Sequence, residues 1–68
     1  MFQNLEIELM KRRITRKQLA EALGISESAL RNKIKGRVDF TFSEIKKILE
    51  MFSDLPWDYL FEQTEAGA

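Results

Sequence analysis

The chain has 68 residues, 44% of them hydrophobic, which is enough for the core of one small domain and leaves no room for a second. It contains no cysteine and no histidine, so disulfide bonds, the usual zinc ligands and the usual general base are excluded. The formal net charge is zero, but residues 11–37 hold nine of the eleven basic residues and two of the eleven acids, so this segment carries +7 and the rest −7.

Two helices are predicted in the first third of the chain. The first covers roughly residues 2–12, where apolar residues recur at intervals of three and four. These residues are Phe2, Leu5 and Leu9. The second begins at Arg16, because Thr15 and Gln18 form a capping box, in which each side chain bonds the backbone amide of the other residue. It ends at Gly24, which can adopt the left-handed conformation found after helix ends.

A third helix is predicted over about residues 27–35. Ser26 is its N-cap, Glu27 supplies the negative charge favoured in a first turn, and Gly36 ends the helix. Its buried side is expected to consist of the apolar residues Ala29, Leu30 and Ile34.

Two further helices complete the predicted fold. A second capping box, at residues 41–44, opens a fourth helix that continues to about Phe52. Its apolar residues are expected to face the core: Phe42, Ile45, Ile48, Leu49 and Phe52. Pro56 fits the first position of a last helix over residues 56–62, and the small, polar residues 63–68 are expected to form a flexible tail. Five short helices with short connections predict an all-α, compact bundle.

Residues 15–36 read TRKQLAEALGISESALRNKIKG and resemble the helix-turn-helix of the phage Cro and repressor family. The matching features are Gln18-Leu19-Ala20, Leu23-Gly24-Ile25-Ser26 and Gly36. The likeness extends over about residues 5–61, since members of that family commonly add two helices that end in a stretch like Asp58-Tyr59-Leu60. The resemblance implies a lambda-repressor-like DNA-binding domain over residues 1–62. It also implies a phage or prophage transcriptional regulator that binds a double-stranded DNA operator.

Two positions depart from the pattern of this family. Arg13 stands where many relatives have Gly or Asn, so the first helix is expected to run on or the backbone to be strained there. Lys33 stands where many relatives place an apolar core residue, and Ile34 beside it can fill the core from a slightly rotated helix. Such a rotation would alter which side chains of the third helix face outward.

The outward face of the predicted third helix carries the candidate base-reading residues. At 100° per residue this face lies opposite Leu30 and Ile34. Ser28, Asn32 and Lys35 point away from the buried side, and Arg31 and Glu27 flank the outward face. The candidates for base reading are Glu27, Ser28, Arg31 and Asn32. Asn32 can pair bidentately with adenine, and Arg31 can reach a guanine or a phosphate. The alternative is an ordinary solvated helix face, and for Glu27 a role in the helix dipole is equally good.

Candidate phosphate-binding residues lie at both ends of the motif, because the resemblance places the start of the second helix against the DNA backbone. They are Thr15, Arg16, Lys17, Lys35 and Arg37. The +7 segment that contains them would attract a phosphate backbone, although a solvated surface with charges sorted by chance explains the same asymmetry.

The aromatic residues divide into core candidates and interface candidates. Those at helical spacing or beside turns are expected in the core: Phe2, Phe40, Phe42, Phe52 and Phe61. A domain this small offers few base contacts, so a homodimer is predicted. Its candidate interface residues, near the end of the chain, are Trp57, Tyr59 and Phe61. The competing interpretation is a monomer in which Trp57 and Phe61 cap the core.

Other functional classes fit the sequence less well. An enzyme is not expected, because only carboxylates remain as catalytic groups and none is paired in a motif. A helical protein-interaction module with little DNA affinity, such as an antitoxin or accessory factor, is the main alternative to a DNA-binding regulator. No metal or other cofactor is expected. The absence of a signal pattern and of long apolar runs predicts a cytoplasmic protein with no membrane association.

Overall fold

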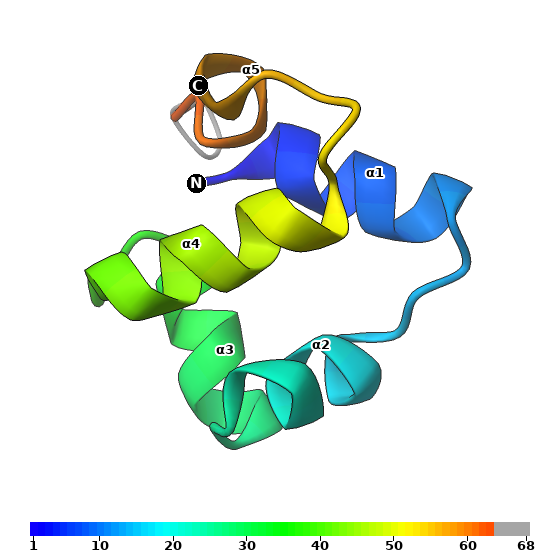
Figure 1. Cartoon of the computed structure of the whole chain (residues 1–68). Helices are drawn as coiled ribbons and strands as arrows, with labels where there is room; N and C mark the ends of the chain where they lie inside the picture. Colours follow the sequence, from blue (N-terminus) through cyan, green and yellow to red (C-terminus); the bar gives the residue numbers. More distant parts are fainter. Residues whose placement is uncertain (64–68) are drawn as a thin grey trace.

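The computed structural model describes residues 1–63, which form five α-helices and no strand (Figure 1). The helices are α1 (Gln3–Lys11), α2 (Arg16–Leu23), α3 (Glu27–Ile34), α4 (Phe42–Met51) and α5 (Trp57–Leu60). The predicted all-α bundle is therefore confirmed. Of the predicted flexible tail, residues 64–68 lie outside the described part of the chain.

Side-chain caps set the first residues of α2, α3 and α4. The capping box at the start of α2 is complete: the Gln18 N–H donates to Thr15 Oγ1 at 3.0 Å, and the Thr15 N–H donates to Gln18 Oε1 at 2.8 Å. The equivalent box before α4 is also present, and at α3 the Ala29 N–H donates to Ser26 Oγ at 3.0 Å. Each such cap contributes about 1 kcal/mol to stability. The starts predicted for these three helices are confirmed.

Left-handed backbone occurs at three described positions outside the helices. Gly24 has a φ of 73° and Gly36 a φ of 83°, as the predicted helix ends require. Arg13, between α1 and α2, has a φ of 56°. This conformation costs a residue with a Cβ about 1–2 kcal/mol. The strain predicted at Arg13 is thus observed, and α1 ends at Lys11 instead of running on.

One hydrophobic core joins all five helices. Its buried members are Leu5, Leu9, Leu19, Ala20, Leu23, Leu30, Ile34, Phe40, Ile48, Phe52 and Leu60. At its edge the rings of Phe2, Phe40 and Phe61 lie with centroids 5.4–5.7 Å apart. The Phe2 N–H also donates to the Ile34 carbonyl at 2.8 Å, which ties the start of the chain to the end of α3.

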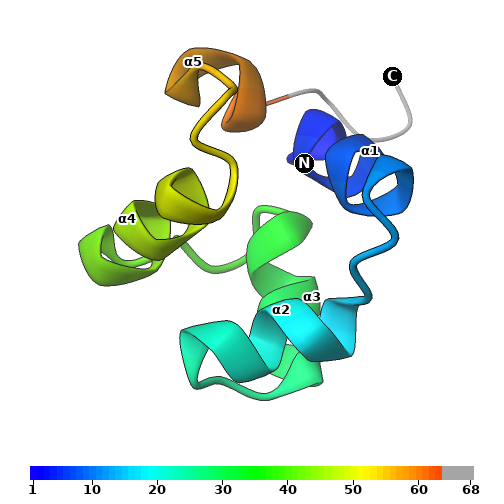
Figure 2. The same cartoon turned by 45° about the vertical axis from the view of Figure 1, so that its right-hand side comes forward.

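The helix-turn-helix pair and the last helix lie at opposite ends of the molecule. The helix pair α2 and α3 lies at one end, and α5 lies beside α1 at the other (Figures 1 and 2). The α2–α3 turn is closed by two hydrogen bonds, from the Gly24 N–H to the Glu21 carbonyl at 3.2 Å and from the Ile25 N–H to the Ala20 carbonyl at 3.0 Å. These two bonds fix the orientation of α3 relative to α2.

Two predictions about the fourth and fifth helices are wrong. Phe42 is 82% exposed and does not face the core. The buried side of this part of the chain is marked by Glu44, Ile48 and Phe52, which follow one another at intervals of four residues. Phe42 is the first residue of α4, two positions before Glu44, and two positions are 200° of helix rotation, so Phe42 lies on the opposite, solvent side. Pro56 is the N-cap of α5 and not its first residue, so α5 is shorter than predicted.

Candidate nucleic-acid interface

Of the four residues predicted to read bases, Ser28 and Asn32 lie on the outward face of α3, and Glu27 and Arg31 flank it. Leu30 and Ile34 are buried against the core, which leaves the opposite side of the helix toward solvent. Glu27, Ser28 and Arg31 are exposed and Asn32 is half-buried. None of these four side chains makes a hydrogen bond or ion pair with another residue of the described chain. The face is polar and has no partner within the molecule's described part.

The turn after α3 presents two of the predicted phosphate-binding residues. The Asn32 carbonyl accepts the N–H of Arg37 at 2.9 Å, and the Lys33 carbonyl accepts the N–H of Gly36 at 3.1 Å. These bonds fold the chain back at the end of the helix. Lys35 and Arg37 are exposed in this turn.

Lys33 is held on α4 by an ion pair that sequence reasoning missed. Its Nζ lies 2.5 Å from Glu44 Oε1 and 2.7 Å from Oε2, and the two side chains are only 11% and 9% exposed. Burial raises the pKa of Glu44, but hydrogen bonds from Lys33 Nζ and the Thr41 N–H outweigh burial and leave this pKa below its usual value. Lys33 thus occupies a largely buried position of α3 at which the family resemblance had predicted an apolar residue.

The ion pair does not turn Ile34 away from the core. Ile34 is 1% exposed, so the face of α3 opposite it stays outward as predicted. Sequence reasoning had assigned Glu44 to its capping box alone. The same carboxylate also accepts the Thr41 N–H at 2.8 Å, so one side chain fixes both the start of α4 and the position of α3.

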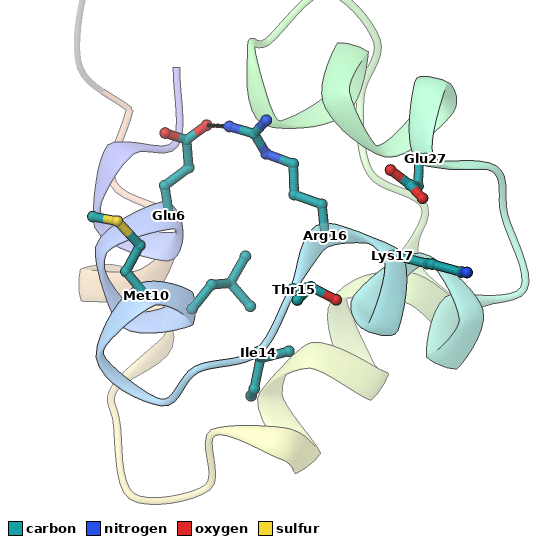
Figure 3. A pocket seen from close by; sticks show the side chains of 8 residues that line it. Glu6, Met10, Ile14, Thr15, Arg16, Lys17 and Glu27 are labelled. Atoms are coloured by element: carbon teal, nitrogen blue, oxygen red, sulfur yellow. Dashed lines mark hydrogen bonds and ion pairs between the residues drawn. The ribbon is translucent and has the colours of Figure 1, made fainter.

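The start of α2 borders a groove of about 420 Å³ between α1, α2 and the first residue of α3 (Figure 3). Arg16 reaches across this groove to α1, where its Nη2 lies 3.1 Å from Glu6 Oε1. Lys17 points away from that pair. The N–H of Thr15 is already used by the Gln18 side chain, so its amide is not free for a phosphate.

The charges at the start of α2 are unusual for a helix. Its first turn holds Arg16 and Lys17 and no acidic residue, whereas α1, α3, α4 and α5 each have an acid there. A helix N-terminus carries a partial positive charge, so two cations beside it repel it and an anion would stabilise the arrangement.

Five of the nine basic residues of segment 11–37 make no ion pair with the part of the chain that the structure describes. Lys11 and Arg12 pair with Glu8, Arg12 also with Asp54, and Arg16 and Lys33 pair as described above. Within residues 1–63 the other five basic residues of segment 11–37 make no ion pair: Arg13, Lys17, Arg31, Lys35 and Arg37. Three of them lie on α3 or just after it, beside the outward face.

The three residues predicted at a dimer interface have different surroundings. Trp57 is 67% exposed. Tyr59 is half-buried and its hydroxyl donates to Glu8 Oε2 at 2.9 Å, while Phe61 packs on the rings of Phe2 and Phe40. Tyr59 and Phe61 therefore make structural contacts within the chain, whereas most of the Trp57 side chain is exposed to solvent.

Other kinds of site receive no support from the described residues. No group of three or more acidic side chains among residues 1–63 is placed to hold a metal ion. Within the same range, no helix has the length and apolar character needed to cross a membrane.

Comparison with protein families identifies the motif built by these helices. Residues 4–53 match the family described as the Cro/C1-type HTH DNA-binding domain. The match spans α1 to α4 and contains both helices of the motif. No curated protein and no solved structure matches the chain.

Proposed function

Because the chain belongs to the Cro/C1-type helix-turn-helix DNA-binding family, we propose that it is a transcriptional regulator that reads double-stranded DNA with α3. The observation that carries this proposal is the outward face of α3, which is polar, faces solvent and is flanked by Arg31, Lys35 and Arg37, three cations that make no ion pair within residues 1–63. The resemblance to phage Cro and repressor proteins extends the proposal to a phage or prophage repressor that acts in the cytoplasm.

Base reading is assigned to four side chains of α3 in the major groove. Asn32 would pair bidentately with adenine, and Arg31 would bind guanine or a nearby phosphate. Ser28 would donate to or accept from several bases. Glu27 would accept from a cytosine amine, in addition to its favourable position in the first turn of α3.

Phosphate binding is assigned to the flanks of the motif. Arg16 and Lys17, at the start of α2, would hold one stretch of backbone, and Lys35 and Arg37 would hold the other. Thr15 would contribute as the residue that caps α2 and so positions the amides that follow it. The cations at the start of α2 support this assignment, because a bound phosphate would relieve their repulsion with the helix dipole.

The phosphate contacts are tested by salt titration. Arg16→Ala or Lys17→Ala is expected to weaken binding to all duplex sequences alike and to reduce the slope of log K against log salt by roughly one unit for each lost contact. Lys47→Ala is the control, since Lys47 is exposed on α4, outside the motif. The slope should stay unchanged in this control.

Two outcomes would contradict the proposed function at different levels. Unchanged slopes in both α2 variants would remove the start of α2 from the backbone contacts. Absence of measurable binding of the wild-type chain to random duplex DNA at low salt would instead favour the protein-interaction module.

The proposed regulator is a homodimer joined through its C-terminal part, with Trp57 as the main contact. Trp57 and Phe42 are large apolar side chains left exposed, and Phe61, Ile45 and Phe40 border a hollow of about 410 Å³ beside Trp57. Since α5 and α2 lie at opposite ends of the molecule (Figures 1 and 2), a symmetric contact through α5 would leave both recognition helices free. Such helices would need to lie about 34–36 Å apart to enter successive major grooves.

Trp57→Ala is expected to raise the dissociation constant of the dimer by about tenfold or more, because aromatic side chains contribute most of the binding energy in small interfaces. Sedimentation at rising concentration, free and with a palindromic DNA site, measures this shift. Met51→Ala is the control, as Met51 is a moderately exposed apolar residue at the end of α4. One wild-type subunit per site under all conditions would rule out the dimer.

A further inference from the structure

We propose that Glu6 competes with DNA phosphate for Arg16 and thereby limits the affinity of the regulator for DNA. The proposal rests on the DNA-binding function proposed above. It assigns a function to a residue of α1, outside the helix-turn-helix motif. In the free protein Glu6 holds the Arg16 guanidinium through Nη2, so a phosphate at the start of α2 competes with this carboxylate for Arg16.

The geometry of the pair makes this exchange possible. The contact is a single hydrogen bond of 3.1 Å from Arg16 Nη2 to Glu6 Oε1, and the two side chains are 49% and 25% exposed. Ion pairs with this much solvent are weak. A phosphate can accept two parallel hydrogen bonds from an arginine, so it is the stronger partner once DNA approaches.

The position of Glu6 lets its carboxylate repel a bound phosphate as well as pair with Arg16. Figure 3 shows Glu6 and Arg16 meeting above the groove, with Glu27 on its far side. A phosphate that approaches the Arg16 guanidinium therefore also approaches the Glu6 carboxylate, and two anions repel each other. Lys17 points away from the pair (Figure 3), and within the described residues the Glu6 carboxylate pairs with Arg16.

Glu6→Gln tests the proposal, because glutamine keeps the size and the hydrogen-bond acceptor of Glu6 and removes its charge. The variant is expected to bind random duplex DNA roughly two- to fivefold more tightly than the wild type at about 0.1 M salt. In the Arg16→Ala background the same change is expected to give no more than the general effect of losing one negative charge. Glu21→Gln measures that general effect, as Glu21 is an exposed acid of α2 with no ion pair in the described residues.

The outcomes separate this proposal from the proposed function. Binding by Glu6→Gln that equals or falls below the wild-type affinity would overturn it, since Glu6 would then be neutral or would position Arg16 for DNA. An equal gain in the Arg16→Ala background would also overturn it, since the effect would be general electrostatics. In both cases the wild-type chain still binds DNA, so the proposed function stands.

Discussion

Glu44→Ala is expected to lower the free energy of unfolding by about 3–4 kcal/mol, because it leaves the Lys33 ammonium without its partner in a largely buried position. It also removes half of the capping box that starts α4. Urea unfolding followed by circular dichroism measures the loss. The matched control is Glu50→Ala on the same helix, since Glu50 is exposed and makes no ion pair within residues 1–63.

The same carboxylate makes stability depend on pH in a defined direction. Burial raises the pKa of Glu44, but hydrogen bonds from Lys33 and Thr41 leave it lowered overall. Its stabilisation is therefore present above the pKa of the unfolded chain and lost as the pH falls through the lower pKa of the folded state. Glu44→Gln keeps an acceptor for the cap and should remove this part of the acid destabilisation. A Glu44→Ala loss no larger than that of Glu50→Ala would contradict the whole account.

The parts of the fold that depend on local sequence were predictable. The capping boxes, Ser26 and the two glycines act within a few residues of themselves, so the starts and ends of α2 and α3 follow from the sequence alone. The buried side of α3 follows from Leu30 and Ile34 in the same way. The residues of the outward face of α3 could therefore be predicted from the sequence.

The errors arise where contacts between distant residues decide the outcome. Lys33 and Glu44 lie on different helices, and the role of Glu44 in its capping box hides their pairing. Phe42 has the apolar character of a core residue, but its place at the first position of α4 turns it to solvent. The bond from Tyr59 to Glu8 joins the two ends of the chain and has no local signal.

The candidate interface shows the same division. Helical geometry selected the residues of α3, whereas the groove at α2 and the Glu6–Arg16 pair depend on how the tertiary fold places α1 relative to the start of α2. Within α3, base reading itself stays a prediction, and Asn32 is the residue that tests it most sharply.

Asn32→Ala is expected to reduce the ratio of specific to non-specific DNA affinity by about five- to 160-fold, because a bidentate contact discriminates between bases by about 1–3 kcal/mol. The fold should survive the change. The structural role of Asn32 is carried by its backbone carbonyl, which accepts the Arg37 N–H at 2.9 Å and which alanine retains. Its side chain makes no hydrogen bond to the described residues that alanine would break.

The measurement begins with selection of bound sites from random DNA, which supplies the operator sequence for the wild-type chain. Affinities for that sequence and for a scrambled duplex are then compared in both proteins at one salt concentration, since phosphate contacts change with salt. Lys35→Ala is the matched control: Lys35 lies at the end of the same helix, and its loss should weaken both duplexes alike. If Asn32→Ala behaves like Lys35→Ala and leaves the ratio unchanged, Asn32 contacts no base, and sequence reading must be assigned to Glu27, Ser28 and Arg31 instead.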